Sequence, residues 1–154
     1  FDDQCVSMTI LAALGEKQHS DVVSVAYDLA TTYGDPLVVL HVVPDEDFDS
    51  YKESLKRIDE FRNVSITQEM DSAAQFARRR VSDVLDGFDS ETISTRGRVG
   101  RPTDEIISET ENLDPRYLVI GGRRRSPAGK AAFGSTTQRV LLGADCPVVT
   151  VMAD

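Results

Sequence analysis

The sequence predicts one α/β domain in which helices cover both faces of a five-stranded, mostly parallel sheet, a doubly wound Rossmann-like fold. Two observations support this prediction. Short apolar runs alternate with segments of helical spacing along the whole chain, and these runs are continuously apolar, as in strands that are buried on both faces. The 154 residues suit one domain, and we expect the strand order 3-2-1-4-5 with residues 1–7 as a flexible extension.

The first part of the chain predicts a strand, a helix and a second strand. Met8 to Leu14 is an apolar run typical of a buried strand. Ser20 is placed to cap a helix and Gly34 to end it. Leu37 to Val43 repeats the strand pattern and stops at Pro44, so the three elements form a right-handed βαβ unit. The helix has an apolar stripe made of Val22, Val25, Ala26, Leu29 and Tyr33.

The stretch from Pro44 to Phe88 has no strand signal and predicts two helices. The shorter one is indicated by the spacing of Tyr51, Leu55 and Ile58. The longer one is indicated by Met70, Ala74, Ala77, Val81, Val84 and Phe88. Thr92 to Val99 alternates weakly and predicts an outer strand.

The last part of the chain completes the alternation. Gly100 and Pro102 mark the start of a helix that carries Ile106 and Ile107, because proline favours the first helical turn. The remaining elements are a buried strand, a helix and a final strand at one edge of the sheet, at Tyr117 to Ile120, Gly134 to Leu142 and Val148 to Val151.

The charge of the chain excludes some partners. Its formal net charge is −9, whereas nucleic acids and anionic membranes bind proteins through a basic face that neutralises phosphates. Asp is more frequent than Glu, and Arg more frequent than Lys, a bias that we interpret as adaptation to high salt. At about 1 M salt the Debye length falls to about 3 Å and like charges repel one another less. We therefore expect a halophilic protein with no nucleic-acid partner.

Two further patterns concern location. No run of about 18 apolar residues is present to span a bilayer. Phe1 to Ser7 carries two acids rather than the basic and apolar pattern of a signal peptide. We expect a soluble, cytoplasmic protein with no membrane partner.

The sequence lacks the patterns of a metal centre or a catalytic site. Cys5 and Cys146 lie far apart without CxxC spacing, so we expect two ordinary thiols and no metal. The histidines, His19 and His41, form no recognisable nucleophile and base pair. Gly129-Lys130-Ala131 lacks the hydroxyl of a Walker phosphate loop. We expect a protein that is not an enzyme, with weak ATPase activity left open.

A long basic loop after the predicted strand Tyr117 to Ile120 carries the main functional signal. It has thirteen residues, Gly121 to Phe133, where such connections usually have about two to six, and no acid occurs from Tyr117 to Ala144. The start of the next helix offers N–H groups and a positive dipole end to a phosphate-like anion. We assign seven residues to this site: Gly121, Gly122, Arg124, Lys130, Gly134, Ser135 and Thr136. A solvated basic loop, with Ser135 only capping its helix, is the alternative.

The same region resembles the fingerprint of the universal stress protein family: glycine, two residues, glycine, nine residues, then glycine with serine or threonine. Gly121 matches the first glycine and Gly134-Ser135 the final pair, but Arg124 occupies the position of the middle glycine. The resemblance covers essentially the whole domain, including ILAAL in the first strand, LHVV in the second and Cys146-Pro147-Val148-Val149 at the last. The run GGRRRSPAGKAAFGST is similar to the version found in proteins of halophilic archaea.

The resemblance implies a stress-response or regulatory module, a homodimer through the last strand Val148 to Val151, and an adenine nucleotide such as ATP as ligand. In ATP-binding members an aspartate at the end of the first strand helps to hold the adenosine, and the main chain after the second strand contacts the base. Gly15, next to Leu14, stands at the aspartate position, and Val42 at the base-contacting position. We therefore expect weakened ATP binding and a shorter anionic ligand. A ligand-free dimeric interaction or protective protein is the alternative.

Overall fold

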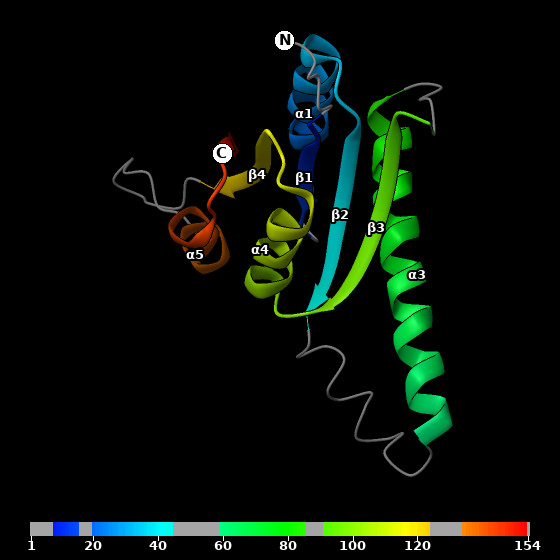
Figure 1. Ribbon diagram of the computed structural model, residues 1–154. Helices are drawn as coiled ribbons and strands as arrows, with labels where there is room; N and C mark the ends of the chain where they lie inside the picture. Colours follow the sequence, from blue (N-terminus) through cyan, green and yellow to red (C-terminus); the bar gives the residue numbers. More distant parts are fainter. Residues whose placement is uncertain (1–7, 16–19, 45–58, 86–90, 124–133, 154) are drawn as a thin grey trace.

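The elements are taken from a computed structural model that describes residues 8–15, 20–44, 59–85, 91–123 and 134–153. In chain order they are β1 (Ile10–Leu14), α1 (Ser20–Tyr33), β2 (Leu37–Pro44), α3 (Asp59–Val84), β3 (Ile93–Gly100), α4 (Pro102–Leu113), β4 (Tyr117–Arg123), α5 (Ser135–Gly143) and β5 (Val148–Ala153) (Figure 1). The described strands pair in parallel in the order β3-β2-β1-β4-β5, which confirms the predicted fold class and strand order.

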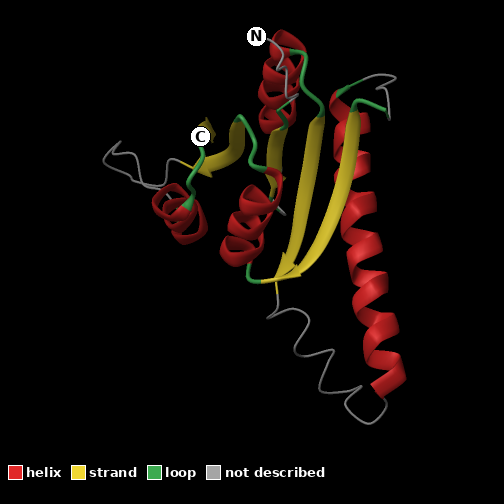
Figure 2. Cartoon of the chain, in the orientation of Figure 1, coloured by secondary structure: helices red, strands yellow, loops and turns green. Residues whose placement is uncertain are grey.

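The sheet separates two layers of helices, which are drawn in red on either side of the yellow strands in Figure 2. Helices α1 and α3 share one apolar core with one face of the sheet, and α4 and α5 share a second core with the other face. Strand β1 belongs to both cores, because Ile10, Ala12 and Leu14 face the first and Leu11 and Ala13 the second. Its uninterrupted apolar sequence is explained by this double burial.

Local sequence signals explain the end of α1 and both ends of α4. Gly34 adopts φ +71 directly after α1, in the left-handed region where glycine is favoured, as the sequence predicts. Helix α4 begins with Pro102 and has Asp104 and Glu105 in its first turn, where acids interact favourably with the dipole. It ends at Asp114, which has φ 44 and donates its N–H to the Thr110 carbonyl oxygen.

The prediction that the loop begins at Gly121 is wrong. Strand β4 continues from Ile120 through Gly121 and Gly122 to Arg123, because these residues pair in register with the last three residues of β5. Gly122 suits this place because an added Cβ would lie 2.8 Å from the Met152 sulfur. The two glycines therefore belong to the sheet rather than to a loop.

The long helix is present as predicted, but its bounds differ from those of the predicted apolar stripe. Helix α3 begins at Asp59, before the first residue of the predicted apolar stripe, and ends at Val84. The short helix predicted around Tyr51 lies outside the described residues, as do Phe88 and the N-terminal residues 1–7.

Gly97 brings α3 close to the sheet. A Cβ at this position would lie 2.6 Å from the Ala74 nitrogen and 2.7 Å from the Ala73 Cβ, and it would also meet the Met70 carbonyl oxygen. These are mostly backbone atoms of α3, so they cannot move aside without shifting the helix. Gly97 pairs with His41 of β2, and the close approach therefore occurs directly beside the second strand.

Two buried carboxylates of the described residues are paired with arginine. On α4, Glu109 is 2% exposed and its two carboxylate oxygens accept bonds from Arg96 at 3.0 Å and Arg98 at 3.2 Å, both on β3. At the amino end of β2, Asp35 accepts a bond of 2.7 Å from Nε of Arg116, whose guanidinium also lies over the Tyr33 ring. Sequence reasoning identified neither pair, because their partners are distant along the chain.

We expect Gly97→Ala to destabilise the protein by about 3 kcal/mol, since α3 must shift to admit the methyl group. Gly15→Ala is the matched control: nothing lies within 4 Å of the added Cβ, and we expect a change within about 0.5 kcal/mol. Urea unfolding of both variants measures the difference. Equal stability of the two variants would contradict the close approach of α3.

Candidate functional site

The candidate site lies where the strand order reverses. Strand β1 has β2 on one side and β4 on the other, and all three carboxyl ends lie at the same edge of the sheet. The ladder between β1 and β2 continues to Leu14 and His41, whereas the ladder between β1 and β4 ends at Ala12 and Val119. The strands β1 and β4 therefore part before Gly121. Ligands of open α/β sheets bind at this kind of position.

The adenosine side of the predicted site is formed by the ends of β1 and β2. Leu14 and Val42 are 8% and 6% exposed, and their side chains lie in the two cores, so each offers mainly its backbone to a ligand. Gly15 follows Leu14 and is exposed, and no atom of the described residues lies within 4 Å of an added Cβ. A larger residue at Gly15 therefore meets no clash with this part of the chain.

The phosphate side is formed by the start of α5. Gly134 is the N-cap, with extended φ −64 and ψ 162, and among the described residues no side chain caps the helix. The interpretation of Ser135 as a capping residue is therefore wrong: Ser135 is the first helical residue, and it is exposed together with Thr136. The N–H groups of the first turn have no partner within the helix, and they lie at the positive end of its dipole.

Thr137 is a residue of this region that sequence reasoning missed. Its hydroxyl donates a bond of 3.0 Å to the carbonyl oxygen of Gly121, and this bond ties the first turn of α5 to β4. The run Ser135-Thr136-Thr137 offers three similar hydroxyl groups, and only the fold shows which one faces the strand. The bond fixes the α5 start relative to the carboxyl end of β4.

The structure brings together part of the predicted phosphate site. Gly121 lies beside α5 through Thr137, and Gly134, Ser135 and Thr136 form the helix start. Gly122 is buried against Met152 and Thr150, so it has a packing role in the sheet. The predicted residues Arg124 and Lys130 lie outside the described residues.

Other kinds of site are not found in the described part of the chain. There, no group of three or more His, Cys, Asp and Glu side chains is arranged to hold a metal ion. No helix within these residues has the length and apolar character needed to cross a bilayer. Burial raises the pKa of the half-buried Cys146 thiol, which favours the unreactive protonated form; Cys5 lies outside the described residues.

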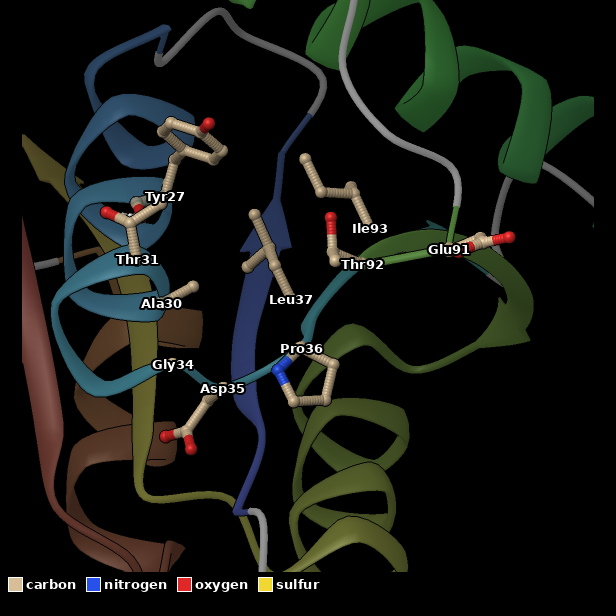
Figure 3. Close-up of a pocket in the computed structure, with 10 residues that line it drawn as sticks. All are labelled: Tyr27, Ala30, Thr31, Gly34, Asp35, Pro36, Leu37, Glu91, Thr92 and Ile93. Carbon is tan, nitrogen blue, oxygen red and sulfur yellow. Dashed lines mark hydrogen bonds between the residues drawn. The ribbon is translucent and has the colours of Figure 1, made fainter.

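A cavity of about 400 Å³ lies away from the candidate site, at the amino ends of β2 and β3. Leu37 and Ile93 form part of its lining, and Tyr27 lies on α1 at one side (Figure 3). The Asp35 carboxylate points away from Leu37 and Ile93 in Figure 3, and it is paired with Arg116. The cavity is therefore separate from the region where β1 and β4 part.

A comparison with protein families matches residues 7–152 to the universal stress protein family. The chain belongs to this family. A universal stress protein of Mycolicibacterium smegmatis is 43% identical over 49 residues, which are 32% of this chain and 38% of that protein. The match thus spans well under half of this curated relative.

Universal stress proteins of known structure share the fold. One from Archaeoglobus fulgidus is 25% identical, with a TM-score of 0.60, over 94% of this chain and 98% of that one. A universal stress protein in complex with cAMP is 16% identical, with a TM-score of 0.62, over 96% and 98% of the two chains. An Archaeoglobus fulgidus universal stress protein in complex with dAMP is 22% identical, with a TM-score of 0.54, over 93% and 96%.

We expect Thr137→Val to destabilise this universal stress protein by about 1 kcal/mol, because the Gly121 carbonyl loses its hydroxyl donor while side-chain volume is kept. Thr136→Val, at the exposed neighbouring position, is the control and should change stability by less than about 0.5 kcal/mol. Urea unfolding compares the two variants. If Thr136→Val proved the more damaging change, the assigned bond would be wrong.

Proposed function

We propose that this universal stress protein is a stress-response module that binds an adenine nucleotide or a phosphate-like anion where β1 and β4 part. The observation that carries the proposal is the uncapped, glycine-started helix α5 beside this point in the sheet. Relatives with the same fold were crystallised with cAMP and with dAMP, which supports adenine nucleotides as the ligand class.

The phosphate half of the site rests on backbone and charge. The first turn of α5 offers N–H groups at a positive helix end, and such ends bind phosphate. From Tyr117 to Ala144 the sequence has no acid, in a chain of net charge −9, so this stretch itself adds no carboxylate that would repel an anion. In the proposal, Arg124 and Lys130 add positive charge from the segment that follows β4.

The adenosine half is weaker than in family members with an aspartate at the end of the first strand. Gly15 supplies no carboxylate, and a charge-assisted hydrogen bond to such a group is worth about 1.5–3 kcal/mol. The loss of such a bond raises the dissociation constant about tenfold to a hundredfold. Arg124, at the position of the middle family glycine, attracts phosphate but takes space from a triphosphate. We therefore propose that ATP binds weakly and that a ligand with one phosphate is preferred.

A calorimetric titration with ATP, AMP and inorganic phosphate tests this proposal. We expect the native chain to bind phosphate and AMP in preference to ATP. The pair Gly15→Asp with Arg124→Gly should gain ATP affinity by about tenfold to a hundredfold, since the open space at Gly15 admits the carboxylate. Gly15→Asn with Arg124→Gly is the control without the added charge. Tight ATP binding by the native chain, unchanged in the pair, would overturn the proposal.

A second candidate is a ligand-free dimeric interaction or protective protein. Gly15 favours it, because the adenosine carboxylate is missing, and so do the outer strand β5 and one exposed apolar side chain on α5. Strand β5 is the last strand of the sheet on the β4 side, and Leu142 on α5 is 81% exposed. Exposed apolar groups and an open strand edge favour association with another chain. Absence of binding to all three titrants would favour this candidate.

For either candidate we propose a homodimer in which two β5 strands pair across a two-fold axis, since such an interface is self-complementary. Light scattering at micromolar concentration in high salt should give twice the chain mass. Leu142→Glu should weaken the dimer about tenfold or more by burying a charge, whereas Ser72→Glu, exposed on α3, should not. A monomeric native chain would reject this arrangement.

The composition of the chain indicates the salt conditions in which it works. The net charge of −9, with its excess of Asp and Arg, favours a role at high salt, and we propose a cytoplasmic, non-enzymatic function there. The net charge disfavours nucleic acid and anionic membrane as partners, and we propose a small ligand and a second copy of the chain instead.

A further inference from the structure

His41 is a buried residue of β2 that the proposed site does not use. It is 5% exposed and pairs in register with Leu14, the last residue of β1. Its Nδ1 atom lies 3.1 Å from the Leu14 carbonyl oxygen. A carbonyl oxygen only accepts hydrogen bonds, so Nδ1 must carry the proton and donate it. A side chain of β2 thus holds the carboxyl end of the neighbouring strand β1.

The imidazole is held in this orientation from the α3 side. The ring of Phe76 lies against it, with centroids 4.3 Å apart and planes tilted by 32°. The Phe76 ring is in turn 4.8 Å from the Arg80 guanidinium. His41 is also the register partner of Gly97, where α3 lies too close to the sheet to admit a Cβ. The close approach of α3 presses an aromatic ring on His41 and limits its rotation.

The bond from His41 acts at the adenosine side of the candidate site. Leu14 immediately precedes Gly15, and His41 immediately precedes Val42. The ladder between β1 and β4 has already ended at Ala12, so the end of β1 is held from the β2 side. Because Gly15 has no side chain, the backbone here is what the chain offers to an adenosine. A small displacement of Leu14 therefore changes the groups that meet the ligand.

We propose that His41 is a positioning residue for the adenosine side of the ligand site: through its Nδ1 bond it fixes the Leu14–Gly15 backbone relative to Val42. This inference rests on the proposed function. It assigns the phosphate side to α5 and Thr137, which do not depend on His41. The two ends of the ligand should therefore respond differently to a change at His41.

The test compares His41→Leu, which removes the donor, with His41→Asn, whose amide nitrogen can take the place of Nδ1. Both are titrated with AMP and with inorganic phosphate. We expect His41→Leu to weaken AMP binding about threefold to tenfold, the effect of one hydrogen bond, and to leave phosphate binding unchanged. His41→Asn should restore most of the AMP affinity.

Val39→Ala controls for loss of packing in β2. Val39 is 0% exposed and lies two residues before His41, so both side chains point to the same face of the sheet. Val39 pairs in register with Ala12 rather than with Leu14. It should lower stability in urea without changing AMP affinity. Native AMP affinity in His41→Leu, equal weakening of phosphate, or equal weakening in Val39→Ala would each overturn the inference. Failure of the native chain to bind AMP would instead refute the proposed adenosine site itself, and with it the role of His41.

Discussion

The structure depends on the burial of β1 on both faces. Every residue from Ile10 to Leu14 is at most 8% exposed, so a layer of helices is required on each side of the sheet. A central parallel strand needs crossover connections on both sides, and the chain therefore reverses direction across the sheet at β1. The same constraint that fills the core thus creates the place where β1 and β4 part, and the candidate ligand site is a consequence of the packing.

The buried acids show how a chain of net charge −9 tolerates carboxylates inside the fold. Glu109 and Asp35 have side chains only 2% and 3% exposed, and both are matched by arginine, whose planar fork donates several directed bonds. Removing the arginines would leave a buried charge without compensation, which costs far more than losing a surface pair. These pairs join α4 to β3, and the start of β2 to the start of β4. They lie away from the carboxyl ends of β1 and β4, where the candidate site is placed.

The sequence predicted the sheet well because its signals are local. Continuous apolar runs identified four strands and weak alternation identified β3, while glycine and proline marked helix ends, as Gly34 and Pro102 confirm. What it missed depends on distant partners: the extension of β4 to Arg123 requires pairing with β5, and the Thr137 hydroxyl requires a carbonyl sixteen positions away. The start of α5 was predicted to within one residue, whereas the roles of Gly122 in packing against β5 and of Gly134 as the N-cap were not predicted. Packing and cap geometry decide those roles, and neither is visible in residue spacing.

The proposed site is made largely of backbone groups, and this decides which residues should control it. The N–H groups of α5, the carbonyl of Leu14 and the main chain at Val42 are present whatever side chain occupies Gly15 or position 124. We therefore expect the departures from the family pattern at Gly15 and Arg124 to change ligand affinity by the free energy of one or two interactions, without abolishing the proposed site. Backbone groups bind well only when they are held in place, since a misplaced dipole loses most of its hydrogen-bond energy. The side chains that hold them, Thr137 on the phosphate side and His41 on the adenosine side, are therefore expected to govern binding although neither need touch the ligand.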